Sequence, residues 1–302
     1  MLDRRAFLAS LAAVGAATAL PRLASAQDTP VLSRKIPSSG EQLPLVGLGS
    51  WRTFNVGNDP QARDACADVM RAFFAGGGRM IDCSPMYGSS QDVIGYGLKK
   101  LNAYDTVFSA EKVWTTSGGP AQIAATREKW GVARFDLLQV HNLLSWQEHL
   151  PMLIDMKAEG AIRYVGITTS HGRRHDEFAR VMRDHPLDFI QVTYNAVDRE
   201  VERRILPLAR ERGIAVICNR PFRGGPLVRR AKRHKLPAWA SEIDCANWAQ
   251  VLLKFVVAHP AVTCPIPATT RVDHVRENIG AAHGRLPDEA LRKRILAAVE
   301  SM

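Results

Sequence analysis

Four side chains in this 302-residue sequence could together deliver a proton to a carbonyl oxygen. Asp82 and Tyr87 lie five residues apart in the stretch MIDCSPMYGS, and Lys112 and His141 follow two later apolar runs. A phenol has a pKa of about 10, but a nearby ammonium favours the phenolate and lowers that pKa. A carboxylate would keep the lysine charged, and an imidazole could hydrogen-bond a substrate oxygen. Such a set would protonate the oxygen as hydride reaches the carbon, without a metal.

Short apolar or β-branched runs must position these side chains, and such runs recur along the chain. Most of them begin about 25 to 30 residues apart, one strand-and-helix unit each, while the last interval is longer and needs an extra loop and helix. A small hairpin, formed by LSRKI, a Pro-Ser-Ser-Gly turn and QLPLVGLG, precedes them. The predicted strands are LVGLG, RMIDC, TVFSA, FDLLQV, RYVGIT, DFIQVT, IAVIC and VTCPI.

Helical patterns fill the intervals between the strands. Apolar residues recur at helical spacing in ARDACADVMRAFFAGG, WQEHLPMLIDMKAEG and WAQVLLKFVVAHP. Strict alternation of strands and helices predicts a parallel sheet with helices outside it. Spacing alone does not separate a closed barrel from an open, doubly wound sheet. The first strand lacks a following G-x-G-x-x-G, which argues against an open dinucleotide-binding sheet.

Polar residues stand at the predicted carboxyl ends of the strands. In a (β/α)8 barrel these ends form one rim, where catalytic groups collect. Taken singly, Asp82 could cap a helix, Tyr87 could pack on the rim, Lys112 could be a surface residue and His141 a satisfied core residue. Their joint occurrence at strand ends favours an active site. The polar residues at the rim are Asp82, Tyr87, Glu111, Lys112, His141, Asn142, Thr168, Thr169, Gln191, Asn219 and Arg220.

Six stretches, in order, resemble the aldo-keto reductase family across essentially all of the chain beyond the N-terminal segment. They are LPLVGLGSW, IDCSPMYGSSQDVIG, EKVW, DLLQVHN, IRYVGITTS and IPATTRVDHVREN. The resemblance implies a single-domain (β/α)8 barrel, a nicotinamide cofactor and reversible reduction of an aldehyde or ketone to an alcohol. It assigns the family's four catalytic positions to Asp82, Tyr87, Lys112 and His141, with Tyr87 as the proton donor.

The resemblance also implies a cofactor site, with departures from the family pattern. The pair Thr168-Thr169 stands where the family commonly has Ser-Asn, and Asn219 stands where it often has a stacking tyrosine. Ala268 and His274 occupy two positions that usually grip a 2′-phosphate, so Arg271 is the compensating candidate, and NADP(H) is favoured over NAD(H). The expected cofactor-binding residues are Ser50, Trp51, Asn142, Thr168, Thr169, Gln191, Asn219, Arg220, Pro221, Phe222, Gly224, Pro267, Thr269, Arg271, Glu277 and Asn278.

Aromatic residues are expected to line the substrate pocket. Trp51 and Trp114 match family aromatics, and Trp146 could supply a third wall from the loop after the fourth strand. Only 24 residues follow Asn278, so the pocket should be open on its C-terminal side. The pair His171 and His175 in HGRRH lacks a carboxylate partner pattern, and we expect a loop there and no metal site.

The N-terminus predicts export. Paired arginines at Arg4-Arg5, an apolar stretch to Leu20 and Ala24-Ser25-Ala26 resemble a twin-arginine signal peptide. Residues 1–26 would be removed after transfer by the twin-arginine machinery to the periplasm, leaving residues 27–302 as the barrel. The apolar stretch is short for a membrane span, so no stable membrane insertion is expected. We expect a monomer.

Charge and cysteine content narrow the classes of partner. The signal contributes three arginines against one aspartate, which leaves +8 of the formal net charge of +10 on the rest of the chain. Much of this excess lies in RRAKRHK, residues 229–235, which we interpret as a solvated helix face, because no nucleic-acid-binding signature accompanies it. Five cysteines without a C-x-x-C do not indicate a disulfide framework.

Two other functions compete with carbonyl reduction. A non-catalytic, nicotinamide-binding barrel acting as a sensor or partner subunit would keep the same four residues, so only a turnover assay separates it from an enzyme. A cofactor-free barrel hydrolase or isomerase would need paired carboxylates or a metal cluster, and the sequence shows neither.

Overall fold

The computed structural model describes residues 30–302, and its main feature is a barrel of eight parallel strands. The predicted signal peptide, residues 1–26, lies outside the described residues. Neighbours in the sheet follow chain order from β3 to β10, so each strand pairs with the next one along the chain. The strands are β3 (Leu48–Gly49), β4 (Met80–Asp82), β5 (Phe108–Val113), β6 (Phe135–Val140), β7 (Ile162–Thr168), β8 (Phe189–Thr193), β9 (Ala215–Asn219) and β10 (Cys264–Pro265).

The sheet closes between its first and last strands. Gly49 forms a parallel bridge with Ala268, and its amide donates to the carbonyl of Pro267 at 3.2 Å. A Cβ atom on Gly49 would lie 2.7 Å from the carbonyl oxygen of Ile266, so this close approach of two backbones requires glycine. Closure decides between the two architectures that spacing left open, in favour of the barrel.

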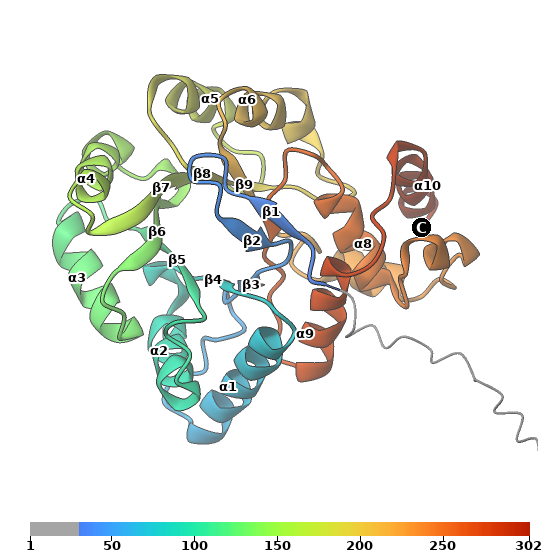
Figure 1. Cartoon of the computed structure of the whole chain (residues 1–302), viewed down its shortest axis with the longest axis horizontal. Coiled ribbons are helices and arrows are strands. Elements are labelled where there is room, and N and C mark those ends of the chain that lie inside the picture. Colours follow the sequence, from blue (N-terminus) through green and yellow to red (C-terminus); the bar gives the residue numbers. More distant parts are fainter. Residues whose placement is uncertain (1–29) are drawn as a thin grey trace, which may run out of the picture.

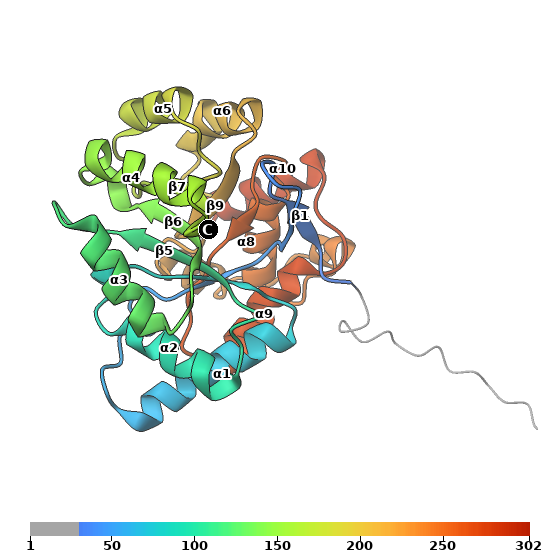
Figure 2. The same cartoon turned by 60° about the vertical axis from the view of Figure 1, so that its left-hand side comes forward.

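Helices cover the outside of the barrel, as Figures 1 and 2 show. The three helical stretches predicted from periodicity correspond to α1, α4 and α8. The α1 helix begins with Pro60 after Asp59, whose side chain accepts from the amide of Ala62 at 2.7 Å. The helices are α1 (Pro60–Ala75), α2 (Ser90–Leu101), α3 (Gly119–Trp130), α4 (Trp146–Ala158), α5 (His175–Asp184), α6 (Ile205–Glu211), α7 (Pro226–Ala231), α8 (Trp248–Val257), α9 (Val272–Ile279) and α10 (Glu289–Glu300).

The predicted hairpin is present and closes the end of the barrel opposite the site. Strands β1 (Ser33–Lys35) and β2 (Gln42–Pro44) pair antiparallel. Ile36 and Leu43 are fully buried in the same apolar cluster as Phe108, Leu137 and Phe189 inside the barrel. Figure 1 shows the hairpin lying across this end. The amino ends of the strands are therefore plugged with apolar side chains, and only the carboxyl ends are free to carry a site.

The long interval before the last strand contains the additional structure that the spacing required. Between β9 and β10 lie α7, a 3-10 helix at Ala238–Ile243, and α8. All five cysteines are buried and free, as expected for a chain without a disulfide framework. Across residues 30–302, no helix combines the length and apolar character needed to cross a membrane.

Candidate active site

An ion pair between β4 and β5 forms the buried base of the site. Lys112 Nζ donates to both carboxylate oxygens of Asp82, at 2.7 and 2.8 Å, and to the carbonyl of Cys83 at 2.6 Å. The two side chains are 0% and 2% exposed. Burial alone would lower the pKa of Lys112, but the Asp82 carboxylate raises it above its usual value. Lys112 is therefore a fixed cation at the rim of the barrel.

Tyr87 is returned to this ion pair by a short turn. After β4, Ser84 caps the 3-10 helix Pro85–Tyr87 by accepting from the amide of Met86 at 3.2 Å. The ammonium of Lys112 lies 5.3 Å from the centre of the Tyr87 ring. The loop thus brings the phenol back over the strand end, beside the Asp82–Lys112 pair.

The net electrostatic effect on Tyr87 differs from the sequence-based expectation. Burial raises the pKa of Tyr87 above its usual value, and Lys112 opposes that rise without reversing it. The expected lowering was therefore wrong in its net direction, because the desolvation of a buried phenolate outweighs its attraction to one ammonium already paired with Asp82. The role of Lys112 is to keep the pKa of Tyr87 below the value that burial alone would give.

His141 completes the set from the end of β6. Its ring stands edge-on to Tyr87, with centroids 5.8 Å apart. Ser84 Oγ lies 2.8 Å from His141 Nδ1 and accepts from the Met86 amide, so the hydroxyl proton is free to point at Nδ1. This arrangement favours the tautomer with the proton on Nε2. Burial, together with Lys112, lowers the pKa of His141 to about 3, so the ring is a neutral donor.

A second buried carboxylate lies behind the ion pair. Glu111 precedes Lys112 on β5 and points to the opposite face of the strand, toward the helices. It is fully buried and accepts from Gln91 Nε2 at 3.0 Å, from Trp130 Nε1 at 2.8 Å and from the Lys112 amide at 2.8 Å. Burial raises the pKa of Glu111 to about 7.

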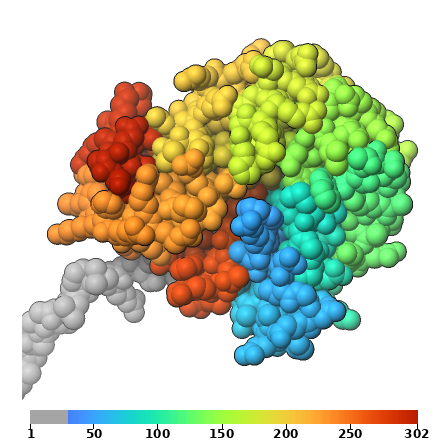
Figure 3. Space-filling view, turned by 180° about the vertical axis from the view of Figure 1, so that it is seen from behind, coloured from blue at the N-terminus to red at the C-terminus, as the bar shows by residue number. Residues whose placement is uncertain are grey.

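A groove of about 880 Å³ opens above these residues at the carboxyl ends of the strands. Asp82, Tyr87 and His141 line it, and Lys112 lies behind Asp82. Every predicted cofactor-binding residue except Thr169 and Arg271 also lines this groove. Figure 3 shows this face, with the blue segment after β3 on one side and the orange and red segments around α7 and α9 on the other. One continuous wall therefore joins the four catalytic candidates to the cofactor candidates.

Hydrogen bonds between the ends of different strands hold the floor of the groove. Gln191 Nε2 donates to Asp82 Oδ1 at 2.7 Å, which links β8 to the ion pair. Asn219 Nδ2 donates to the carbonyl of Thr169 at 2.9 Å, and Thr193 Oγ1 donates to Asn219 Oδ1 at 2.6 Å. Both ends of the Asn219 amide are thus engaged within the floor, and Asn219 offers no aromatic surface for stacking.

Two predicted cofactor residues are turned away from the groove. Thr169 is buried, and its hydroxyl donates to the carbonyl of Arg173 at 2.7 Å. The Arg271 side chain is 62% exposed and forms a two-pronged ion pair with Asp273. That pairing already satisfies the guanidinium, so the expected compensation at the 2′-phosphate position is not supported by this geometry.

Of the three predicted substrate-pocket tryptophans, only Trp51 lines the groove. Trp114 is 40% exposed on the loop after β5 and lies outside the lining. The Trp146 indole donates to Glu177 Oε1 at 2.8 Å and packs edge-on against His185. Contacts with Glu177 and His185 therefore hold the Trp146 side chain outside the lining of this groove.

Several cations in the groove were not singled out from the sequence as cofactor candidates. The guanidinium of Arg52 lies 4.3 Å from the centre of the Trp51 ring. Burial lowers the pKa of nearby Arg220, and Arg223 and Arg52 lower it further. Arg229 and Lys232 reach the groove from α7 and the residue after it, and Lys232 Nζ lies 3.6 Å from Glu277. In the sequence, Arg229 and Lys232 were marked only by the basic run at residues 229–235, which we interpreted as a solvated helix face.

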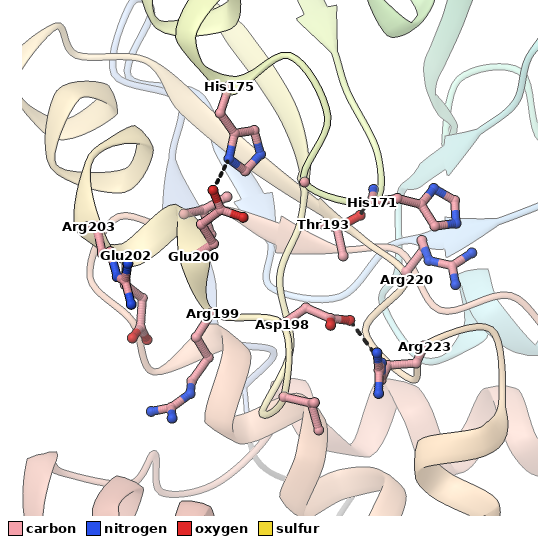
Figure 4. Close-up of a pocket in the computed structure, with 13 residues that line it drawn as sticks. His171, His175, Thr193, Asp198, Arg199, Glu200, Glu202, Arg203, Arg220 and Arg223 are labelled. Atoms are coloured by element: carbon pink, nitrogen blue, oxygen red, sulfur yellow. Dashed lines mark hydrogen bonds and ion pairs between the residues drawn. The ribbon is translucent and has the colours of Figure 1, made fainter.

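A second cavity of about 730 Å³ adjoins the groove (Figure 4). His171, Arg220 and Arg223 line both spaces. Asp198 in the second cavity pairs with Arg223 at 3.1 Å, and no acidic side chain of residues 30–302 is in ion-pair contact with Arg220. Arg220 is therefore available for an anion in the groove.

The HGRRH segment forms the loop that leads into α5, as expected. Among residues 30–302 there is no group of three or more His, Cys, Asp or Glu side chains arranged to hold a metal ion.

Comparisons with known proteins agree with this geometry. The model of the aldo/keto reductase family matches residues 45–294. An NADH-specific methylglyoxal reductase of Escherichia coli is 27% identical over 84% of this chain and 95% of its own length. An uncharacterized oxidoreductase of Schizosaccharomyces pombe is 26% identical over 82% of this chain and 84% of its own length.

The fold also matches solved structures. An aldo/keto reductase from Klebsiella pneumoniae, solved with NADP and acetate, superimposes with a TM-score of 0.71 at 23% identity. The match covers 85% of this chain and 93% of the other. The barrel and its hairpin therefore have the architecture that the sequence predicted.

Proposed function

The chain belongs to the aldo/keto reductase family and is an enzyme of that family, and on this premise we propose that it reduces a small aldehyde or ketone with Tyr87 as the proton donor. The observation that carries the proposal is the meeting of Tyr87, His141 and the Asp82–Lys112 pair at one end of a groove lined by 14 of the 16 predicted cofactor residues. Reductive chemistry needs an acid beside a hydride acceptor, and this arrangement supplies that acid.

A bound reduced nicotinamide would supply the hydride, that is, a proton together with two electrons, to the carbonyl carbon. The residues of this chain then do the remaining work. His141 Nε2–H orients the carbonyl oxygen by donating a hydrogen bond, and Tyr87 gives its phenolic proton to that oxygen as the alcohol forms. Lys112 stabilises the resulting phenolate until solvent returns the proton, and Asp82 keeps Lys112 in place.

The groove has the chemistry expected of a dinucleotide site. Arg220 forms no ion pair with an acidic side chain of residues 30–302. Arg220 and Arg52 both line the groove and are available for pyrophosphate oxygens, because guanidinium forks bind phosphate oxygens well. Asn142 and Gln191 present amides at the nicotinamide end, and Glu277 lies at the opposite end with Lys232.

We propose NADP(H) as the favoured cofactor. The support is a pair of cations, Arg229 and Lys232, in the lining of the groove, because a 2′-phosphate needs a positive partner. Lys232 Nζ lies 3.6 Å from Glu277, a predicted adenosine-side contact. The E. coli relative is NADH-specific by name, so the selectivity of this chain rests on its own residues.

A turnover assay tests the function. The purified protein is given NADPH or NADH with a panel of aldehydes, quinones and ketoses, and loss of the reduced cofactor is followed by absorbance. We expect saturable oxidation with at least one carbonyl. Cofactor binding without oxidation across the panel would instead support the non-catalytic alternative, in which the barrel serves as a sensor or partner subunit.

We also propose that the enzyme is a periplasmic monomer that the twin-arginine machinery exports in its folded state. The support is the N-terminal pattern at Arg4-Arg5 and Ala24-Ser25-Ala26. The small carbonyl substrate would then be one that reaches that compartment.

A further inference from the structure

The turn that follows β6 carries His141 and Asn142, and its backbone is strained. Asn142, Leu143 and Ser145 have φ values of 54°, 55° and 46°, in the left-handed region that side chains with a Cβ disfavour. Strained residues of this kind persist only where the surroundings impose their conformation. Residues 141–145 contain no glycine, the residue that adopts such φ values most readily.

An arginine from the segment before α5 contacts this turn. Arg174 Nη1 donates to the carbonyl of Asn142 at 3.1 Å and to the carbonyl of Leu143 at 2.9 Å. Arg174 lies in the HGRRH segment, directly before α5, and it does not line the groove. Backbone carbonyls outside a regular helix need another hydrogen-bond donor, and here one guanidinium donates to two consecutive carbonyls.

The guanidinium is itself fixed from its other side. Arg174 Nε and Nη2 lie 2.8 and 2.7 Å from Glu177 Oε2, and the Trp146 indole donates to Glu177 Oε1 at 2.8 Å. Hydrogen bonds from Arg174 and Trp146 hold the pKa of Glu177 below its usual value, so the carboxylate is charged. Trp146 is the first residue of α4, the helix that follows the turn. The contacts from Arg174 through Glu177 to Trp146 therefore connect the turn with this helix.

We propose that Arg174 is a positioning residue for the reduction proposed above, holding the strained turn so that His141 and Asn142 face the groove. Glu177 and Trp146 set the guanidinium in the orientation that contacts both carbonyls. From the other side, Ser84 fixes the His141 ring and Thr168 Oγ1 accepts from the Asn142 amide at 2.9 Å. The turn is thereby held by β4, β7 and α5 together, and Arg174 supplies the α5 contact.

The test compares Arg174→Ala with Arg173→Ala. Arg173 is a neighbouring arginine whose side chain, among residues 30–302, hydrogen-bonds only His171 Nδ1, at 3.5 Å. We expect Arg174→Ala to lower kcat by about 10- to 100-fold, the scale on which a small displacement of reacting groups acts. The dissociation constant for NADPH, measured by fluorescence titration, should rise through Asn142. Arg173→Ala should change neither quantity by more than about two-fold, the range of ordinary surface substitutions.

Chemical rescue separates positioning from general damage. The Arg174 side chain is 42% exposed, so a free guanidinium ion can enter the space left by Arg174→Ala. Guanidinium chloride far below its denaturing range should restore part of kcat in Arg174→Ala and none in a variant of another site. An unchanged kcat in Arg174→Ala relative to Arg173→Ala would overturn the proposal, and so would a lowered kcat that guanidinium does not restore.

Two further variants keep the test decisive if Arg174→Ala does not fold. Arg174→Lys retains the charge but cannot contact both carbonyls and Glu177, so it should give an intermediate loss of kcat. Trp146→Phe keeps the ring packing but removes the hydrogen bond to Glu177, and it should give a smaller loss in the same direction. Wild-type kcat in both variants would contradict the proposed chain of contacts.

A readout without turnover distinguishes this inference from the proposed function. With 13C-labelled histidine, the ring resonance of His141 should shift or broaden in Arg174→Ala and not in Arg173→Ala, whether or not any carbonyl is reduced. If the wild-type protein reduces nothing but the resonance behaves in this way, the reductase assignment of the site fails and the positioning role stands. An unperturbed His141 resonance in Arg174→Ala would overturn the positioning role alone.

Discussion

Replacing Lys112 by methionine tests how the buried ion pair acts on Tyr87. Methionine keeps the length of the side chain and removes its charge. With 5.3 Å between the ammonium and the ring centre, and an effective dielectric constant of about 20, Coulomb's law gives about 3 kcal/mol for the attraction of the phenolate. That energy corresponds to a rise of about two units in the pKa of Tyr87.

The expected loss of kcat follows from that rise. If about half of the pKa change appears in the barrier for proton transfer, kcat falls by roughly ten-fold, and if all of it appears, by roughly 200-fold. Tyr87→Phe removes the donor itself and should cost at least about 100-fold, the scale of general acid catalysis. Both variants should still bind cofactor, because neither side chain is a predicted cofactor contact.

Stability must be controlled, because Lys112→Met leaves Asp82 charged and buried without a cation. Breaking such a pair costs about 3–5 kcal/mol, enough to unfold a marginal protein. The matched variant is therefore Asp82→Asn combined with Lys112→Met, which removes both charges. It should unfold at a denaturant concentration closer to that of the wild type. Its loss of kcat should be smaller than that of Lys112→Met alone, because the Asp82 carboxylate raises the pKa of Tyr87 and its removal offsets part of the change.

A double-mutant cycle decides whether Lys112 acts through Tyr87. The assay is kcat with saturating NADPH and one carbonyl substrate, for Tyr87→Phe, for Lys112→Met and for the two combined. If the lysine works on the phenol, adding Lys112→Met to Tyr87→Phe should cost little more, since the group it influences is already gone. A full, additive loss in the combined variant would refute the reasoning.

Three further predictions concern the cofactor, the buried carboxylate and the N-terminus. Arg229→Ala should weaken the binding of NADPH more than that of NADH, whereas Arg271→Ala should leave the ratio of the two dissociation constants unchanged; the reverse result in fluorescence titrations would return Arg271 to the 2′-phosphate. Because burial raises the pKa of Glu111 from 4.5 to about 7, the folded protein binds this proton more tightly than the unfolded chain. The associated stability is present below pH 4.5 and is lost as pH rises through 7, on the order of 3 kcal/mol. Glu111→Gln should remove this part of the pH dependence in denaturant titrations, and an unchanged profile would show that Glu111 does not titrate in that window. Fractionated cells should contain the mature protein in the periplasm, beginning after Ala26, and intact cytoplasmic protein that still carries residues 1–26 would rule out export.

The sequence was sufficient for the features that depend on local order. The eight strand runs, the hairpin before them and the longer last interval follow from alternating apolar patterns and turn residues, and each appears in the structure. Parallel strands joined by helices must bring their carboxyl ends to one rim, so Asp82, Tyr87, Lys112 and His141 could be grouped before any coordinates existed. Fourteen of the sixteen cofactor residues that the family resemblance implied also line the groove.

Only the tertiary structure decided what depends on partners distant in sequence or on burial. Whether the sheet closes rests on the approach of Gly49 to Ile266, more than 200 residues away. Trp146 was expected in the substrate pocket, but Glu177 on α5 holds its indole elsewhere. Arg174 could not be connected to the His141 turn from its position in HGRRH, because that contact spans more than 30 residues.

The pKa of Tyr87 also depends on burial, which only the tertiary structure decides. From the sequence, a lysine beside a tyrosine predicts a lowered phenol pKa, because only the attraction between the two charges can be anticipated. In the folded barrel the phenol of Tyr87 is removed from water, and the loss of hydration raises the pKa by more than Lys112 lowers it. The sequence specifies the residue types and the order of the strands. Desolvation of the Tyr87 phenol depends on the atoms packed around it, and it arises only once the chain has folded.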